Sequence, residues 1–392
     1  MARAIVKSAV LRWARKSRGL NLDDVASSTI PAARIAAWES DDEDAAPTVK
    51  QLRALAKKYK RPLGVFYLSE PPEEDEVIPD FRRMPDFDDG DEKSPELRLE
   101  LRLARERREE AIELGRALGE LPAPITLRAD AEADPDQQAA EIREMLGVST
   151  DRIARIRSAR EAFLEWRSAL EKLGVLVFQT GGMRGYKVSP DEARGFVIAD
   201  QPFPVVVANG SDPETARSFS LMHEFVHVLL SQSGLCDQHE RRSGRKSSDD
   251  VEIFCNRVAG AVLVPRDSLL TDPTVRGRSE DRPEWPDEDL HLISRRFHVS
   301  AEVVMRRLVI VGRASNAYYS NWRASQEPWM PSEKGFLKPV DRVIKRNGRL
   351  LPRLVLLAKE GGEIPRSDIY DLLSISPSYI SEIESRVFEA SD

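Results

Sequence analysis

The segment around residues 216–230 constrains this chain more than any other part of its sequence. Apolar side chains occupy almost every face of the helix that it predicts: Ala216, Phe219, Met222, Phe225, Val226, Leu229 and Leu230. Such a helix is mostly buried, because none of its faces is suited to water. The segment also contains His223-Glu224-Phe225-Val226-His227, so three polar side chains must lie inside a core. Burying them without a partner would be costly, and we expect them to bind something.

The spacing of the two histidines suits a metal ion. Residues four apart on a helix share one face, with β-carbons about 5–6 Å apart, so His223 and His227 can converge on one ion. Neutral imidazole is a good zinc ligand. Glu224 lies beside that face and can take a proton from a water molecule whose pKa the metal lowers. The pattern therefore predicts two ligands and a catalytic base.

A second apolar helix offers a third ligand. We predict it from Asp250 to Leu263, ended by Pro265. Glu252 near its start would complete a His, His, Glu set with a fourth position open to water, the arrangement of a catalytic zinc. Asp249 or Asp250 could take its place. A glutamate near a helix start could also serve only to favour the helix dipole.

Two neighbours of Glu252 bear on the expected site. Asn256, one turn later, could orient a metal ligand. Cys255 could be a ligand itself, but we expect it to pack as a small apolar side chain. Cys236 is the only other cysteine, so a disulfide framework and a four-cysteine zinc site are excluded. The expected cofactor is Zn²⁺, with Mn²⁺ as the alternative.

The remaining histidines, His239, His291 and His298, are interpreted as surface or structural residues. One of them could stabilise an oxyanion, and spacing alone does not choose among them.

The hydropathy pattern argues against a membrane protein. No apolar run approaches the roughly 18 residues that span a bilayer. The first residues also lack the apolar core of a signal peptide. We therefore expect a cytoplasmic protein with no membrane partner.

Three β-branched clusters precede the histidine helix. They predict strands at Val175–Phe178, Phe196–Ala199 and Pro204–Ala208. A zinc peptidase needs an edge strand that holds an extended substrate by pairing with it. We expect residues Val205–Ala208 to supply that edge.

The formal net charge of −7 hides two segments of opposite sign. Residues 1–70 carry 13 Lys/Arg and 8 Asp/Glu, whereas residues 71–93 carry 3 and 10. The second segment is rich in proline and has almost no apolar periodicity, so it reads as an extended linker. Ser94 and Pro95 then begin a long helix to about Leu121. Its Arg- and Glu-rich face is interpreted as a solvated surface with small ion-pair gains.

Residues 1–70 predict short helices with a positive balance, and they resemble an Xre-type helix-turn-helix. The resemblance rests on Leu11, Arg15, Gly19, Leu22, Val25, Ala26, Ile35, Trp38, Glu39, Pro47, Thr48, Leu52 and Ala56. It implies that Ala32–Ala37 face the major groove of double-stranded DNA. Arg34 would contact a base edge, and Arg12, Arg15, Lys16 and Arg18 would lie near phosphates.

Two features of this unit oppose strong DNA binding. The recognition segment contains Ala32, Ala33, Ala36 and Ala37, which offer no side-chain hydrogen bonds. Four acidic residues follow at 41–44, where phosphates would approach. The alternative is a helix-turn-helix that docks to a protein or to itself. Fainter copies of the pattern at 292–308 and 364–384 are interpreted as ordinary helical packing.

The peptidase-like segment also resembles a known family. His223–His227, the preceding Ala216–Met222, the strand Val205–Asn209 and the helix Glu252–Pro265 are similar to ImmA/IrrE metallopeptidases over roughly residues 165–310. The resemblance implies a zincin-like domain in which His223, His227 and Glu252 hold zinc and Glu224 is the base. It also implies cleavage of a DNA-binding repressor or antitoxin rather than general digestion.

The sequence therefore predicts an α+β multidomain protein. Its parts are an all-α helix-turn-helix domain at 1–70, the linker at 71–93, a zincin-like domain with a small sheet at 94–312, and a helical region at 313–392. The predicted function is a zinc-dependent regulatory endopeptidase, with links to stress response or toxin–antitoxin systems. Its expected partners are a repressor or antitoxin substrate, DNA through residues 1–70, and a second copy in a homodimer.

Two other functions stay open from the sequence. One is a DNA-binding transcriptional regulator whose metal site is structural or sensory. The other is an antitoxin or toxin-linked module that acts by protein contact. Replacing Glu224 separates a peptidase from the first of these, because only the peptidase needs that base.

Overall fold

The computed structural model of the chain describes residues 3–388 with several gaps. Outside the description are residues 5, 19, 41–44, 60, 62, 73–93, 182–186, 232–247, 279–283 and 327–336. The predicted linker at 71–93 and the acidic residues at 41–44 thus lie almost wholly outside it. The described residues form two compact units, one before Leu103 and one from Leu103 onward. The predicted α+β multidomain class is confirmed.

The first unit is built of helices, as predicted for residues 1–70. They are α1 (Ser8–Lys16), α2 (Leu22–Val25), α3 (Ala32–Trp38), α4 (Val49–Tyr59) and the short 3-10 helix η1 (Leu63–Tyr67). Thr48 and Gln51 cap α4 reciprocally: the Thr48 N–H donates to Gln51 Oε1 at 2.9 Å, and the Gln51 N–H donates to Thr48 Oγ1 at 3.3 Å. Leu11, Ile35 and Leu52, from α1, α3 and α4, are buried together in the core.

The second unit sets a small sheet among helices. Its strands are β1 (Leu176–Gln179), β2 (Gly195–Ile198) and β3 (Val205–Ala208), each within one residue of the predicted range. Before the sheet come α5 (Pro95–Leu118), α6 (Pro135–Leu146), α7 (Thr150–Ala154) and α8 (Ala159–Lys172). After it come α9 (Glu214–Ser231), α10 (Ser248–Leu263), α11 (Arg266–Thr271), α12 (Pro273–Arg276), α13 (Asp287–Phe297), α14 (Ala301–Ile310) and α15 (Asn316–Ser325). The chain ends with α16 (Pro339–Asn347), α17 (Leu350–Gly361), α18 (Asp368–Leu373), η2 (Pro377–Tyr379) and α19 (Ile380–Phe388).

The strand order corrects one prediction from the sequence. The order is β1-β3-β2, with β3 parallel to β1 and antiparallel to β2. Val205–Ala208 therefore forms the central strand and cannot be the edge that receives a peptide. The continuous apolar run of Val205–Ala208 shows that both faces of the strand are buried. It does not show whether the strand is central or at an edge. Among the described strands, β2 has β3 as its only neighbour, so β2 is an edge.

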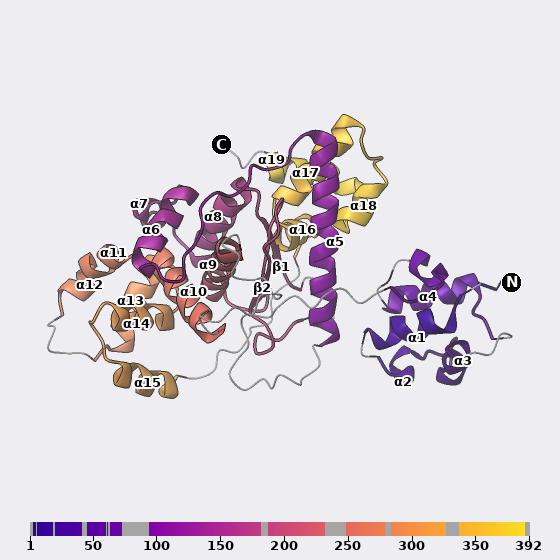
Figure 1. Cartoon of the computed structure of the whole chain (residues 1–392), viewed down its shortest axis with the longest axis horizontal. Helices are drawn as coiled ribbons and strands as arrows, with labels where there is room; N and C mark the ends of the chain where they lie inside the picture. The colour runs from indigo at the N-terminus through magenta and orange to yellow at the C-terminus, as the bar shows by residue number, and fades with distance from the viewer. Residues whose placement is uncertain are drawn as a thin grey trace. The chain divides into compact units, whose positions relative to one another are not determined.

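Helix α9 packs on the sheet and is anchored at its start by one arginine. Figure 1 shows α8 and α9 on one side of the strands and α16 on the other. Arg217 donates to the backbone oxygen of Asp212 at 2.9 Å, to Gln179 Oε1 at 2.7 Å and to Glu214 Oε1 at 2.8 Å. These bonds tie the first turn of α9 to the end of β1. Within the described residues no helix, α9 included, is long and apolar enough to cross a membrane.

Helix α5 is not simply a solvated surface helix. Arg108 donates to the backbone oxygens of Asp200 at 2.9 Å, Pro202 at 3.1 Å and Phe203 at 3.1 Å. Burial lowers the pKa of Arg108. The interpretation of this helix face as solvent-exposed is therefore wrong at Arg108, which holds the turn between β2 and β3.

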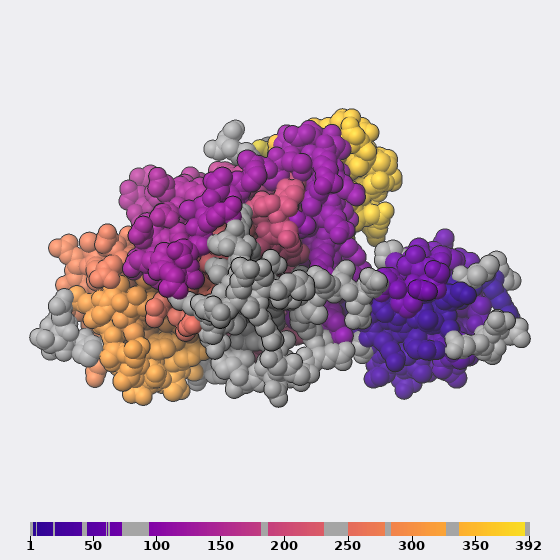
Figure 2. Space-filling view, viewed as in Figure 1, coloured from indigo at the N-terminus to yellow at the C-terminus, as the bar shows by residue number. Residues whose placement is uncertain are grey.

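The C-terminal helices pack against β1 rather than forming a separate body. Arg167 in α8 donates to the backbone oxygen of Val177 at 2.6 Å and to that of Lys345 at 3.1 Å, and it pairs with Glu171. Glu171 Oε1 in turn accepts the N–H of Arg349 at 2.8 Å. Figure 2 shows these helices, in yellow, against α5. Both sides of the predicted boundary at residue 312 thus fall in one compact unit, and the four predicted domain ranges stay predictions.

We predict that Gly348→Ala destabilises the second unit far more than Gly362→Ala. Both glycines have positive φ, +72° and +78°, so both variants lose roughly 1 kcal/mol from backbone strain. A Cβ at position 348 would also overlap Glu171 Oε1, whereas nothing lies within 4 Å of one at position 362. Displacing a buried ion-pair partner costs about 3 kcal/mol. Denaturant midpoints of the two variants measure the difference, and equal midpoints would contradict the close contact at Gly348.

Candidate functional site

Helices α9 and α10 bring three metal-ligating side chains together. His223 and His227 Nε2 are 3.2 Å apart, and the Glu252 carboxylate lies 3.2 Å from the first and 3.0 Å from the second. Ligands about 2.0–2.1 Å from a tetrahedral zinc are separated by about 3.3 Å. The three donors therefore fit such an ion. Among the described residues this is the group of His, Cys, Asp and Glu side chains with metal-ligand spacing.

The site is buried on the histidine side and open on the glutamate side. Both histidine side chains are 0% exposed, whereas Glu252 is 20% exposed. Burial raises the pKa of Glu252, but hydrogen bonds with His223 and His227 outweigh it and lower that pKa to about 2. A carboxylate held ionised beside two imidazoles is ready to bind a cation without first losing a proton.

Of the alternatives for the third ligand, Asp250 does not join the group. Asp250 is exposed and lies outside it, and the side chain of Asp249 is outside the described residues. Asn256 makes no side-chain hydrogen bond within the described part of the chain and lines a cavity instead. The suggestion that Asn256 orients a ligand therefore has no support in the structure.

Cys255 lies beside Nδ1 of His227. Its Sγ is 3.7 Å from Nδ1 of His227, the nitrogen that faces away from Glu252. Cys255 is fully buried and is not part of the three-residue metal group. The burial of Cys255 agrees with the prediction that it packs as a small apolar side chain. Its sulfur is also a weak acceptor to which Nδ1–H of His227 can donate.

Glu224 faces the sheet rather than α10. It is 1% exposed, and a Cβ on Gly195 would lie 3.0 Å from Glu224 Oε1 and 3.1 Å from its Cγ. Gly195, the first residue of β2, is therefore what makes room for the predicted base. Sequence reasoning did not find Gly195, since a glycine at a strand start usually marks only a turn.

The buried side chain of Asn209 holds the segment that precedes β2. Asn209 donates from Nδ2 to the backbone oxygens of Val188 at 3.2 Å and Ala193 at 2.7 Å. Its Oδ1 accepts the Thr180 hydroxyl at 3.1 Å and the Ser211 N–H at 2.9 Å. All its hydrogen-bonding capacity is used. The segment that leads to Gly195 is thereby held to the end of β3.

The other described histidines lie elsewhere. His291 Nδ1 is 2.6 Å from the backbone oxygen of Asp287, and His298 Nε2 is 3.0 Å from that of Ile156. Burial lowers the pKa of His298. Neither belongs to the metal group, which leaves the structural interpretation of both in place; His239 is outside the described residues.

In the first unit, three of the five expected DNA-contacting residues bond internally. Arg15 forms a bidentate pair with Glu39 at 2.8 and 2.6 Å, and Arg12 donates to the backbone oxygen of Glu39. Arg18 is 6% exposed and donates to the backbone oxygen of Pro95 at 2.9 Å. These arginines hold the fold. Lys16 and Arg34 are exposed, and Arg34 lies on α3, the helix expected to face DNA.

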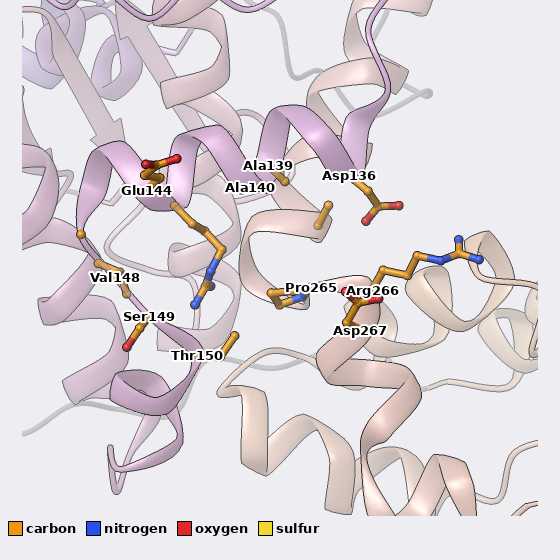
Figure 3. Close-up of a pocket in the computed structure, with 13 residues that line it drawn as sticks. Asp136, Ala139, Ala140, Glu144, Val148, Ser149, Thr150, Pro265, Arg266 and Asp267 are labelled. Carbon is orange, nitrogen blue, oxygen red and sulfur yellow. The ribbon is translucent and has the colours of Figure 1, made fainter.

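A cavity of about 640 Å³ lies away from the metal group. Its lining includes Asp136 and Glu144 of α6 together with Ser149, Thr150 and Arg266 (Figure 3). No residue of the metal group lines it, and acidic and basic side chains are mixed along its walls. It therefore gives no reason to place the chemistry there.

Comparison with known families agrees with both resemblances, that of the helix-turn-helix segment and that of the peptidase-like segment. Residues 170–309 match the peptidase M78 family model, described as an IrrE N-terminal-like domain. Residues 11–66 match a helix-turn-helix model. No curated protein matches the chain. The predicted fusion of a helix-turn-helix with an ImmA/IrrE-like domain is confirmed.

We predict that the purified chain holds one equivalent of zinc and that His227→Ala abolishes this binding, because the variant loses one of three donors. Cys255→Ala is the matched control: it removes a neighbour of the same ring on the side away from Glu252, so zinc stays bound with at most a 10- to 100-fold weaker affinity. Metal analysis and competition with a chelator measure both. Complete loss of zinc in Cys255→Ala would show that the sulfur is itself a ligand.

Proposed function

We propose that this chain is a zinc-dependent endopeptidase that cleaves a DNA-binding repressor or an antitoxin-like protein. The convergence of His223, His227 and Glu252 is the observation that supports it, and Glu224 directly follows His223 in the sequence. A structural zinc site closes all four positions with protein ligands, whereas the described residues offer three. The match of residues 170–309 to a peptidase family supports the same chemistry.

The residues divide the reaction among them. Zn²⁺ bound by the three ligands would supply a Lewis acid that polarises the scissile carbonyl. Glu224 accepts the proton of the attacking water and delivers it to the leaving amine. Its burial against Gly195 keeps the carboxylate in place for both transfers. The low pKa of Glu252 keeps the third ligand ionised.

The edge strand β2 is the proposed track for the substrate. It pairs with β3 on one side, and a Cβ on its first residue, Gly195, would lie 3.0 Å from Glu224 Oε1. An extended peptide that adds to the other side of β2 would place its backbone beside the base. This assignment replaces the central strand β3, which has both sides occupied.

The helix-turn-helix gives a physical reason for a DNA-binding substrate. A catalytic domain tethered to a DNA-bound unit meets proteins on nearby DNA at a high effective concentration. Because Arg12, Arg15 and Arg18 bond internally, the proposed DNA contacts reduce to Lys16 and Arg34. A homodimer, the expected form of many such DNA readers, belongs to the same proposal.

We predict that Glu224→Gln lowers the cleavage rate by about 10²- to 10⁴-fold while zinc content stays unchanged, because the amide cannot accept the proton. Wild-type and variant chains are incubated with cell extract and zinc or manganese. The substrate is the protein that disappears only with wild type. Equal cleavage by the variant would overturn the role of Glu224. No cleavage by either chain would favour a regulator with a structural or sensory metal.

We predict that Arg34→Ala weakens binding to a duplex selected from random sequences about tenfold or more, with an unchanged denaturant midpoint, because Arg34 is exposed. Arg15→Ala should instead lower the stability of the first unit by about 3 kcal/mol, since it leaves the Glu39 carboxylate buried without its partner. Fluorescence anisotropy and unfolding curves separate the two effects. Unchanged DNA affinity in Arg34→Ala would favour a docking role for this unit.

A further inference from the structure

A second cavity, of about 220 Å³, lies near the metal group, although no residue of that group lines it. Its walls come from α9, α10, α14 and α15 and include Phe219, Ile253, Asn256, Arg257, Ile310 and Tyr319. This volume is below the 300 Å³ or more of a typical drug-sized ligand site, so it suits a single side chain.

Two residues connect this cavity to the metal ligands. The ring of Phe219 stacks on His223, with centroids 6.3 Å apart and planes inclined by 30°. Ile253 directly follows Glu252, the ligand on the open side of the site. Phe219 thus lines the cavity and stacks on His223, so a group that fills the cavity would lie one side chain away from the metal group.

The mouth of the cavity is apolar and exposed. Ile253 is 50% exposed and Ile310 is 41% exposed, although both are large aliphatic side chains. Val303 continues the apolar wall inward at 7% exposure. Covering these side chains with an aliphatic group removes apolar surface from water, which is favourable.

The charge at the rim is unbalanced and positive. Arg306 pairs with Glu302 at 2.9 Å, and Arg307 pairs with Asp136. Arg257 is exposed and has no ion pair or side-chain hydrogen bond within the described part of the chain. A carboxylate close to the bound aliphatic side chain would complement this free guanidinium.

We propose that this cavity is the specificity pocket of the peptidase, taking one large aliphatic side chain of the substrate while Arg257 pairs with an acidic residue beside it. This inference rests on the proposed function. It names the local chemistry of the cleavage site: an aliphatic residue with an acidic neighbour.

A peptide library tests it on the full chain with zinc. Wild type should enrich an aliphatic residue at one position and an acidic residue next to it, as read by mass spectrometry of the products. Arg257→Glu should lose the acidic preference by about 3- to 5-fold, the size of an exposed ion pair. Ile310→Asp should lose the aliphatic preference about tenfold. Arg295→Glu and Leu292→Asp, exposed positions on α13 outside the cavity, are the matched controls and should match wild type.

A binding measurement keeps the test independent of turnover. Fluorescein-labelled Gly-Leu-Glu-Gly and Gly-Glu-Leu-Gly are titrated into zinc-loaded Glu224→Gln chain, with Leu→Gly and Glu→Lys peptides as comparisons. The peptide that binds more tightly should bind about tenfold more weakly when its Leu is replaced by Gly. A chain that also carries Arg257→Glu should no longer bind this peptide more tightly than its Glu→Lys form. Peptide preferences unchanged in Arg257→Glu and Ile310→Asp would overturn the pocket. Binding preferences without any cleavage by wild type would overturn the peptidase and leave the pocket standing.

Discussion

The convergence of two imidazoles and one carboxylate inside an apolar core is the constraint on which the rest of the second unit depends. Helices α9 and α10 must pack closely enough for His223, His227 and Glu252 to lie within about a tetrahedral edge of one another. Two arginines from other helices hold the C-terminal end of α10. Arg143 donates to the Val262 oxygen at 2.6 Å, and Arg307 donates to the Val264 oxygen at 3.0 Å. They occupy carbonyls that a helix end leaves without partners.

Buried and half-buried arginines connect segments throughout this unit. Arg108 binds the β2–β3 turn, Arg167 joins α8 to β1 and α16, and Arg217 joins α9 to β1. A guanidinium offers five donors in a planar fork, so one side chain can serve backbone oxygens from several segments. Such residues read as solvated charge in a sequence, because their helical spacing is that of an ordinary surface face. Their role depends on which carbonyls come near, and that is set by tertiary packing.

The sequence predicted the parts of the site that depend on local spacing. The histidine pair follows from helical geometry alone, and Glu252 followed from the next apolar helix; the three strands lie within one residue of their predicted bounds. What could not be predicted depends on non-local pairing. The order of the strands places β2 at an edge, and the role of Gly195 depends on how β2 packs against Glu224. The internal bonds of Arg12 and Arg15 likewise require Glu39, more than twenty residues away in sequence.

Helix α10 carries both the proposed metal ligand Glu252 and residues of the proposed specificity pocket. The Glu252 carboxylate is the exposed member of a group whose histidines are buried, so the group is open to solvent on the α10 side. That helix carries Glu252 and, lining the cavity, Ile253, Asn256 and Arg257. Ligand and pocket residues thus share one rigid backbone, which fixes their separation better than residues on loops could. A shift of α10 that moved Glu252 would move these cavity residues as well, so the proposed metal site and the proposed specificity pocket are mechanically coupled.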